Sequence, residues 1–166
     1  MPETAINIRP HLVPYFLKEF EGKEAVYLNR KVSSIKVPAS SSLGRWMGML
    51  MLQVENTGRH ADYYTLYLTA EITPEGKKYE GNYYRHESGP SSFLTMPEDI
   101  NKAVNEILED IFRMSFVAFM DGVMMRPDSS ITKGIDYFID KYELLEVGFS
   151  RQSMRQLYFR EKKKAG

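Results

Sequence analysis

The sequence predicts an α+β fold, in which an N-terminal antiparallel sheet of meander or hairpin form packs on a long helix and a C-terminal helical hairpin follows. Two observations predict this order. Before about residue 96, apolar and polar residues alternate in short stretches, as in strands, and after it apolar residues recur at helical spacing. A chain of 166 residues that is 43% hydrophobic is long enough and apolar enough to enclose a real core.

The strand pattern is clearest in residues 63–72. One face carries Tyr64, Leu66, Leu68, Ala70 and Ile72, and the other carries Tyr63, Thr65, Tyr67 and Thr69. Thr73–Gly76 has the composition of a turn, so the chain is expected to return as the second strand of a hairpin. Apolar residues in 25–37 indicate another strand, with an irregularity near Ser33 and Ser34. The predicted sheet segments are residues 25–37, 63–72, 78–86 and 91–95.

Two early segments leave alternatives open. Residues 14–20 favour a short helix with its aromatic side chains near one face. The serines at 40–42 could cap a helix running to Met51, but Gly44 and Gly48 lower helix propensity, so the same residues could form a buried strand.

The second half of the chain is expected to be helical. Apolar spacing predicts a long helix over about 97–125, stopped by Arg126–Asp128. Ser129 or Ser130 caps the next helix, Gly148 supplies a turn, and Ser150 caps a final helix with Met154, Leu157 and Tyr158 facing inward. We therefore divide the chain into an α+β core, 1–126, and a helix-turn-helix-like unit, 127–166, within one compact domain.

Composition limits the function. The chain has no cysteine, which removes disulfides, Cys-zinc sites and thiol nucleophiles and fits a reducing cytoplasm. The longest apolar stretch, residues 46–52, is too short to span a membrane, and the start lacks the pattern of a secretory signal. No enzyme signature is present, so we expect a non-enzymatic protein that uses no cofactor and no metal.

Charge is balanced over the whole chain but not along it. Residues 97–149 carry 5 basic and 11 acidic side chains, whereas residues 150–166 carry six basic and one acidic. On a helical wheel the polar side chains of the last helix group opposite its apolar ones. Arginine can bond guanine edges, glutamine adenine edges, and lysine phosphates. The predicted DNA-binding residues are Arg151, Gln152, Arg155, Gln156, Lys162, Lys163 and Lys164. The alternative is a solvated surface helix whose cations favour its C-terminal dipole.

The stretch from Lys133 to Arg160, KGIDYFIDKYELLEVGFSRQSMRQLYFR, resembles the helix-turn-helix ends of small bacterial phage or mobile-element proteins. The opening from Ile8 to Gly22, IRPHLVPYFLKEFEG, is similar to uncharacterised proteins of that sort. The resemblance implies a bacterial, cytoplasmic protein that handles duplex DNA. A helix-turn-helix usually keeps a small residue early in its turn, where this chain has Glu146 and Val147.

Other features leave room for a different function. Six of the 11 tyrosines lie within residues 63–84, where they could pack within the sheet, form a protein interface or stack bases. The Met-rich stretch 112–125 is apolar almost all round, so it belongs to the core or to a dimer seam. The leading hypothesis is a DNA-binding protein that acts as a homodimer. The second is an interaction or structural oligomerising module, in which the tyrosine-rich hairpin and the Met-rich helix end contact a partner chain. An enzyme using His11, His60 or His86 is the third.

Overall fold

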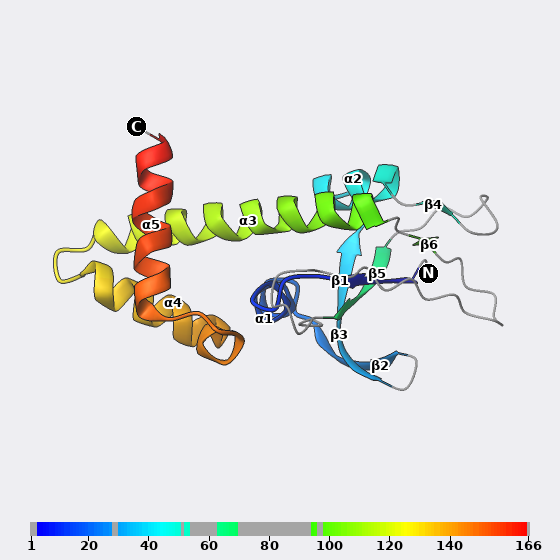
Figure 1. Ribbon diagram of the computed structural model, residues 1–166, viewed down its shortest axis with the longest axis horizontal. Coiled ribbons are helices and arrows are strands. Elements are labelled where there is room, and N and C mark those ends of the chain that lie inside the picture. The colour runs from blue at the N-terminus through cyan, green and yellow to red at the C-terminus, as the bar shows by residue number, and fades with distance from the viewer. Residues whose placement is uncertain are drawn as a thin grey trace. The chain divides into compact units, whose positions relative to one another are not determined.

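The computed structural model describes residues 3–27, 30–50, 52–53, 63–69, 94–95 and 98–165. The chain forms two compact units, residues 1–105 and residues 106–166, and the boundary between them falls inside one long helix, α3 (Glu98–Met124). Figure 1 shows the strands in the first unit and only helices in the second. The α+β class is confirmed.

The first unit is built on a four-stranded sheet in the order β1-β5-β3-β2. The β2–β3 and β3–β5 pairs are antiparallel, as predicted, but β1 lies parallel to β5, so the sheet is mixed and the expectation of a purely antiparallel one is wrong. A second, two-stranded antiparallel sheet joins β4 to β6. The bounds are β1 Glu3–Asn7, β2 Lys23–Tyr27, β3 Arg30–Pro38, β4 Leu52–Gln53, β5 Tyr63–Thr69 and β6 Leu94–Thr95.

The predicted strand over 25–37 is in fact a hairpin, because the chain reverses between Tyr27 and Arg30. Pairing is continuous through Ser33 and Ser34, so the irregularity expected there is absent from the described ladder. β5 confirms the strand predicted from residue 63, and its Leu66 and Leu68 are buried. The predicted turn at 73–76 and strand at 78–86 lie outside the described residues.

Two short helices pack against β3, α1 (Leu12–Glu19) and α2 (Ser42–Leu50). Residues 42–50, for which a helix and a buried strand were both considered, form the helix α2. The Ser41 hydroxyl caps this helix by accepting the N–H of Gly44. Gly44 is needed although it lowers helix propensity, because a β-carbon there would overlap the carbonyl oxygen of Pro38. The predicted helix over 14–20 is confirmed as α1.

Three helices form the second unit: the part of α3 from residue 106 onward, α4 (Ile131–Tyr142) and α5 (Arg151–Ala165). A 3-10 turn, η1 (Leu144–Val147), follows α4. The ring centroids of Phe138 in α4 and Phe116 in α3 lie 4.9 Å apart. Ser130 caps α4, because its hydroxyl accepts the N–H of Lys133. The buried apolar side chains of this unit are Leu108, Phe112, Phe116, Met120, Ile135, Phe138, Ile139, Tyr142, Leu144, Met154, Leu157 and Tyr158.

The Met-rich end of α3 is only partly in the core. Phe112, Phe116 and Met120 are fully buried, whereas Met114 is 65% exposed and Met125, just after the helix, is 87% exposed. The stretch is therefore not buried all round, and one helical stripe supplies its core contacts.

Candidate nucleic-acid interface

The last helix, α5, begins with a reciprocal cap. The Ser150 hydroxyl accepts the N–H of Ser153, and the Ser153 hydroxyl accepts the N–H of Ser150. Two backbone donors that a helix start leaves unsatisfied are thereby bonded, which is the logic of a capping box. The predicted Ser150 cap is confirmed, and α5 has a defined start.

One face of α5 packs against α3 within the second unit, with the residues that the helical wheel predicts. Met154 is completely buried, and Leu157 and Tyr158 are buried beside it. The Tyr158 ring lies 6.3 Å from that of Phe116, and its hydroxyl donates to Asp121 on α3. Burial, followed by the charge of Asp121, raises the pKa of Tyr158. α5 crosses the second half of α3 (Figure 1) and is held there by apolar and polar contacts.

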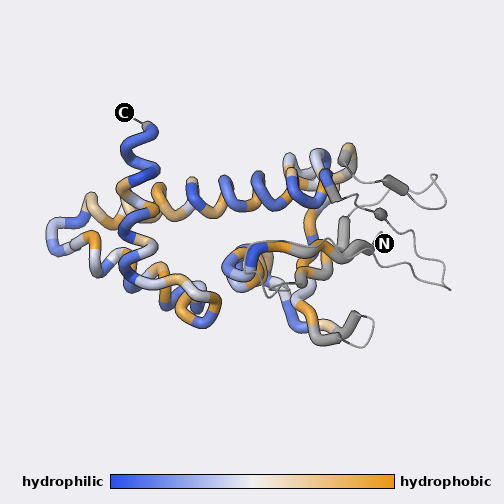
Figure 2. The backbone as a smooth tube through the Cα atoms, viewed as in Figure 1, coloured by the Kyte–Doolittle hydropathy of each residue, from blue (hydrophilic) through white to orange (hydrophobic). Residues whose placement is uncertain are grey.

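The opposite face points away from this packing. We call Gln152, Arg155, Gln156, Phe159 and Lys163 the outer face of α5; all five are exposed. The Arg155 guanidinium lies 5.5 Å from the centre of the Phe159 ring, a cation–π contact that engages its charge. Neither Arg155 nor Lys163 forms an ion pair with a carboxylate of the described residues. Figure 2 shows the hydrophilic run at the end of the helix.

Two flanking cations, by contrast, are neutralised by carboxylates from other helices. The Arg151 guanidinium donates to both carboxylate oxygens of Asp136 on α4, with Nε–Oδ1 at 2.6 Å and Nη2–Oδ2 at 2.8 Å. The Lys162 ammonium lies 2.7 Å from Asp121 Oδ2. These hydrogen bonds raise the pKa of both groups. Arg151 therefore ties α5 to α4, and Lys162 ties α5 to α3.

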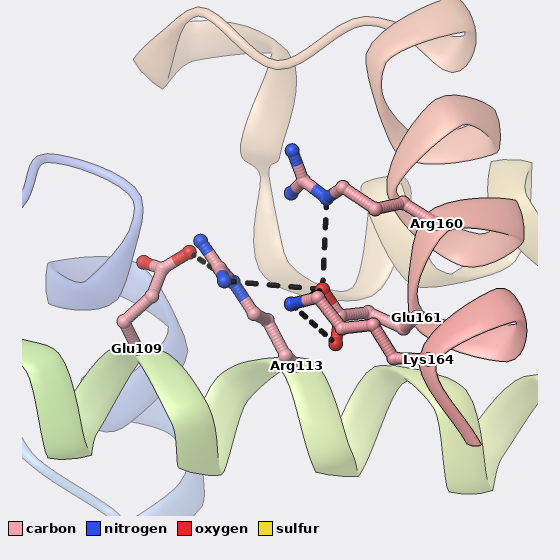
Figure 3. A network of polar contacts seen from close by, with 5 residues as sticks. All are labelled: Glu109, Arg113, Arg160, Glu161 and Lys164. Atoms are coloured by element: carbon pink, nitrogen blue, oxygen red, sulfur yellow. Dashed lines mark hydrogen bonds and ion pairs between the residues drawn. The ribbon is translucent and has the colours of Figure 1, made fainter.

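A third carboxylate, Glu161, collects cations on the side of α5 that faces α3 (Figure 3). Its Oε1 lies 3.1 Å from Lys164 Nζ, 3.6 Å from Arg160 Nε and 3.8 Å from Arg113 Nη1. Arg113 in turn donates to Glu109 at 2.8 Å. Lys164 is therefore partly neutralised, and Glu161 ties α5 to α3 through Arg113.

The structure thus divides the seven predicted residues into two groups. Gln152, Arg155, Gln156 and Lys163 lie together on the outer face of α5, whereas Arg151, Lys162 and Lys164 pair with carboxylates. Sequence reasoning missed Asp121 and Asp136, because their contacts with α5 depend on how three helices pack. The only signal for them was the acidic excess of residues 97–149.

The connection between α4 and α5 differs from the predicted short turn. It runs from Glu143 to Ser150 and contains η1, so it is longer than the three- or four-residue turn of a helix-turn-helix. Glu143, at φ 54°, and Gly148, at φ 87°, adopt left-handed conformations at the two ends of η1. Gly148 confirms the turn predicted there, and the candidate interface is therefore limited to α5.

The other candidate sites receive no support from the described residues. His11 is buried, and His60, His86 and most of the tyrosine-rich hairpin lie outside those residues. Within the described part of the chain, no three His, Cys, Asp or Glu side chains are grouped to hold a metal ion. Within the same part, no helix combines the length and apolar character needed to cross a membrane.

No protein-family model matches the sequence, and neither a curated protein nor a solved structure matches the chain.

Proposed function

We propose that this protein binds duplex DNA through the outer face of α5 and is not an enzyme. The observation that carries the proposal is the separation of the two faces of this helix. Met154, Leu157 and Tyr158 fix one face, while Arg155 and Lys163 stand exposed on the other without carboxylate partners among the described residues.

The chemistry of the outer face suits a DNA groove. The major groove of B-DNA admits an α-helix, and arginine and glutamine can each bond two atoms of one base edge, on guanine and adenine respectively. Gln152, Arg155 and Gln156 lie within about one turn of each other near the start of α5. Lys163, two turns further on, would contact phosphate, which adds affinity without reading sequence.

The strength of this binding follows from the local charge. The six cations of α5 and Arg113 face four carboxylates, Glu109, Asp121, Asp136 and Glu161, which leaves a net charge of +3. A protein that neutralises three phosphates should show a slope of about −2.7 when log affinity is plotted against log salt concentration. We therefore propose moderate, strongly salt-dependent binding rather than tight binding.

A second candidate function is an interaction module with no role in nucleic-acid binding. Phe159 favours it, because this large apolar ring is 47% exposed at the centre of the outer face, and aromatic residues are enriched in protein interfaces. In the DNA hypothesis the same ring would contact a thymine methyl group.

The proposed location is a reducing cytoplasm, which the cysteine-free composition suits, and the proposed context is a bacterial mobile element.

Fluorescence anisotropy on a labelled duplex tests the proposal at 50 and 200 mM salt. The wild type should lose about 40-fold in affinity over this range, and Arg155→Ala/Lys163→Ala, with a local charge of +1, about 3.5-fold. Lys36→Ala/Lys102→Ala is the matched control, since it removes two exposed cations elsewhere, and it should behave like the wild type. Undetectable binding at 50 mM salt, or equal effects of the two double variants, would exclude the outer face of α5 as the interface.

A further inference from the structure

The second unit contains an open pocket of about 750 Å³ between the end of α3 and the start of α4. The rings of Phe119 and Tyr137 form part of its wall and stack with centroids 5.7 Å apart and planes 12° apart. Gly122 also lines it, and apart from the chain neighbours and the backbone of its own helix, no atom of the described residues lies within 4 Å of where a β-carbon would stand. The pocket is therefore an apolar hollow that admits a side chain from outside.

The charged groups at this pocket are two cations and one carboxylate. Arg126 and Lys133 are exposed lining residues, as is Asp128, which gives the rim a net charge of +1. Lys133 Nζ donates to the backbone oxygen of Asp128 and forms no ion pair with a carboxylate of the described residues. An apolar group flanked by carboxylates would match both the hollow and its rim.

Such a group is present at the other end of α4. Leu145 is 63% exposed, although Leu144 beside it is completely buried. Glu143 and Glu146 flank Leu145, and both are exposed. We call Glu143, Leu145 and Glu146 the acidic knob.

The acidic knob is held in a defined conformation. Backbone hydrogen bonds join Glu146 to Glu143, Gly148 to Leu145 and Phe149 to Leu144. Because the turn is ordered and Leu144 anchors it, presenting Leu145 to a partner costs little additional conformational entropy.

The pocket lies beside the first half of α4, and the acidic knob follows the end of this helix. Tyr137, the lining residue nearest the knob along the chain, stands five residues before the end of α4, so about 7.5 Å of rigid helix separates the pocket wall from the knob. A molecule cannot place its own Leu145 in its own pocket without unfolding α4. If the two surfaces meet, they meet between two molecules.

We infer that the protein self-associates by inserting the acidic knob of one copy into the α3–α4 pocket of a second copy. Leu145 contacts the Phe119 and Tyr137 walls, and Glu143 and Glu146 approach Arg126 and Lys133. The two surfaces are different, so the contact is heterologous unless two copies exchange knobs. A single knob buries much less than the roughly 1,200 Å² typical of stable interfaces, so the association is weak and depends on concentration.

Sedimentation equilibrium without DNA, from about 10 μM to 1 mM protein, tests this inference at the concentrations where such weak contacts populate. The wild-type average mass should rise with concentration. Leu145→Asp should stay monomeric, and Arg126→Glu/Lys133→Glu and Glu143→Lys/Glu146→Lys should each weaken association at least about tenfold through like-charge repulsion. Lys36→Glu/Lys102→Glu, which reverses two exposed cations elsewhere, should associate like the wild type.

The decisive variant combines all four charge reversals, because it restores opposite charges across the contact. It should regain association close to that of the wild type, and an equimolar mixture of the two double variants should also associate. All the substituted positions are exposed, and unchanged thermal melting confirms that each variant is folded. A wild type that stays monomeric at 1 mM, or a fourfold variant that remains dissociated, overturns the inference.

Discussion

The carboxylates that neutralise α5 allow a gain-of-function prediction. Asp121→Asn/Asp136→Asn keeps the size of both side chains and an acceptor oxygen for Tyr158 and Arg151, but removes the charges that pair with Lys162 and Arg151. The local net charge rises from +3 to +5. The slope of log affinity against log salt should then steepen from about −2.7 to about −4.5.

The difference between the two salt slopes gives the expected change in affinity. If wild type and variant bind equally at 1 M salt, where electrostatic attraction is screened, the variant should bind duplex DNA about 60-fold more tightly at 0.1 M. Anisotropy titrations at four or more salt concentrations measure both the slope and the affinity. A slope equal to that of the wild type would refute the argument that Asp121 and Asp136 mask cations of a DNA-binding face.

A matched control separates local from total charge. Asp99→Asn/Asp110→Asn changes the charge of the whole chain by the same two units at exposed positions of α3. Because neither carboxylate pairs with a cation of α5 among the described residues, replacing them should alter the slope less. Equal effects of the two double variants would show that binding follows total charge rather than the outer face of α5.

Three further predictions concern the fold itself. Gly44→Ala should lower the free energy of unfolding by about 1–3 kcal/mol because its β-carbon meets backbone, whereas Gly122→Ala, in open space on α3, should raise it by about 0.5–1 kcal/mol; urea titration measures both, and equal signs would contradict the packing. Ser150→Ala should cost about 1 kcal/mol by removing the cap of α5, seen as a lower thermal midpoint, whereas an unchanged midpoint would deny the cap. The tyrosinate absorbance of the wild type minus that of Tyr158→Phe reports the ionisation of Tyr158 alone. Its titration midpoint should lie above the ordinary tyrosine pKa, and Asp121→Asn should lower this midpoint only in part, since burial is the larger cause of the raised pKa. A group whose pKa is raised on folding stabilises the fold fully at pH values below its unfolded-state pKa, and this stabilisation is lost as pH rises through its folded-state pKa. The free energy of unfolding should therefore fall in that alkaline range. A Tyr158 titration midpoint at the ordinary tyrosine pKa would contradict the burial of Tyr158.

Local sequence signals predicted the helical half well. The caps at Ser130 and Ser150 and the inward face of α5 depend on residues within two turns of each other, where hydrogen bonding and periodicity act directly. The stop after Met124 also follows from local chemistry, since Arg126–Asp128 contains a proline that cannot continue a helix.

Features that depend on distant residues were missed. β1 was not predicted, because five residues with weak alternation carry little strand signal, and its parallel partner β5 lies some sixty residues away. Residues 25–37 appeared as one strand because both arms of the hairpin are rich in strand-forming residues and the reversal between Tyr27 and Arg30 is short. Asp121 and Asp136 were overlooked for the same physical reason, since only tertiary packing brings them to α5.

DNA binding by the outer face of α5 is tested most directly by mapping backbone amide chemical shifts during titration with an unlabelled DNA duplex. If the outer face of α5 binds DNA, the largest shifts should fall on Gln152, Arg155, Gln156 and Lys163, with smaller ones at the ion-paired Arg151 and Lys162. Shifts that concentrate on the sheet or on α1, or a spectrum that does not change at low salt, would contradict it.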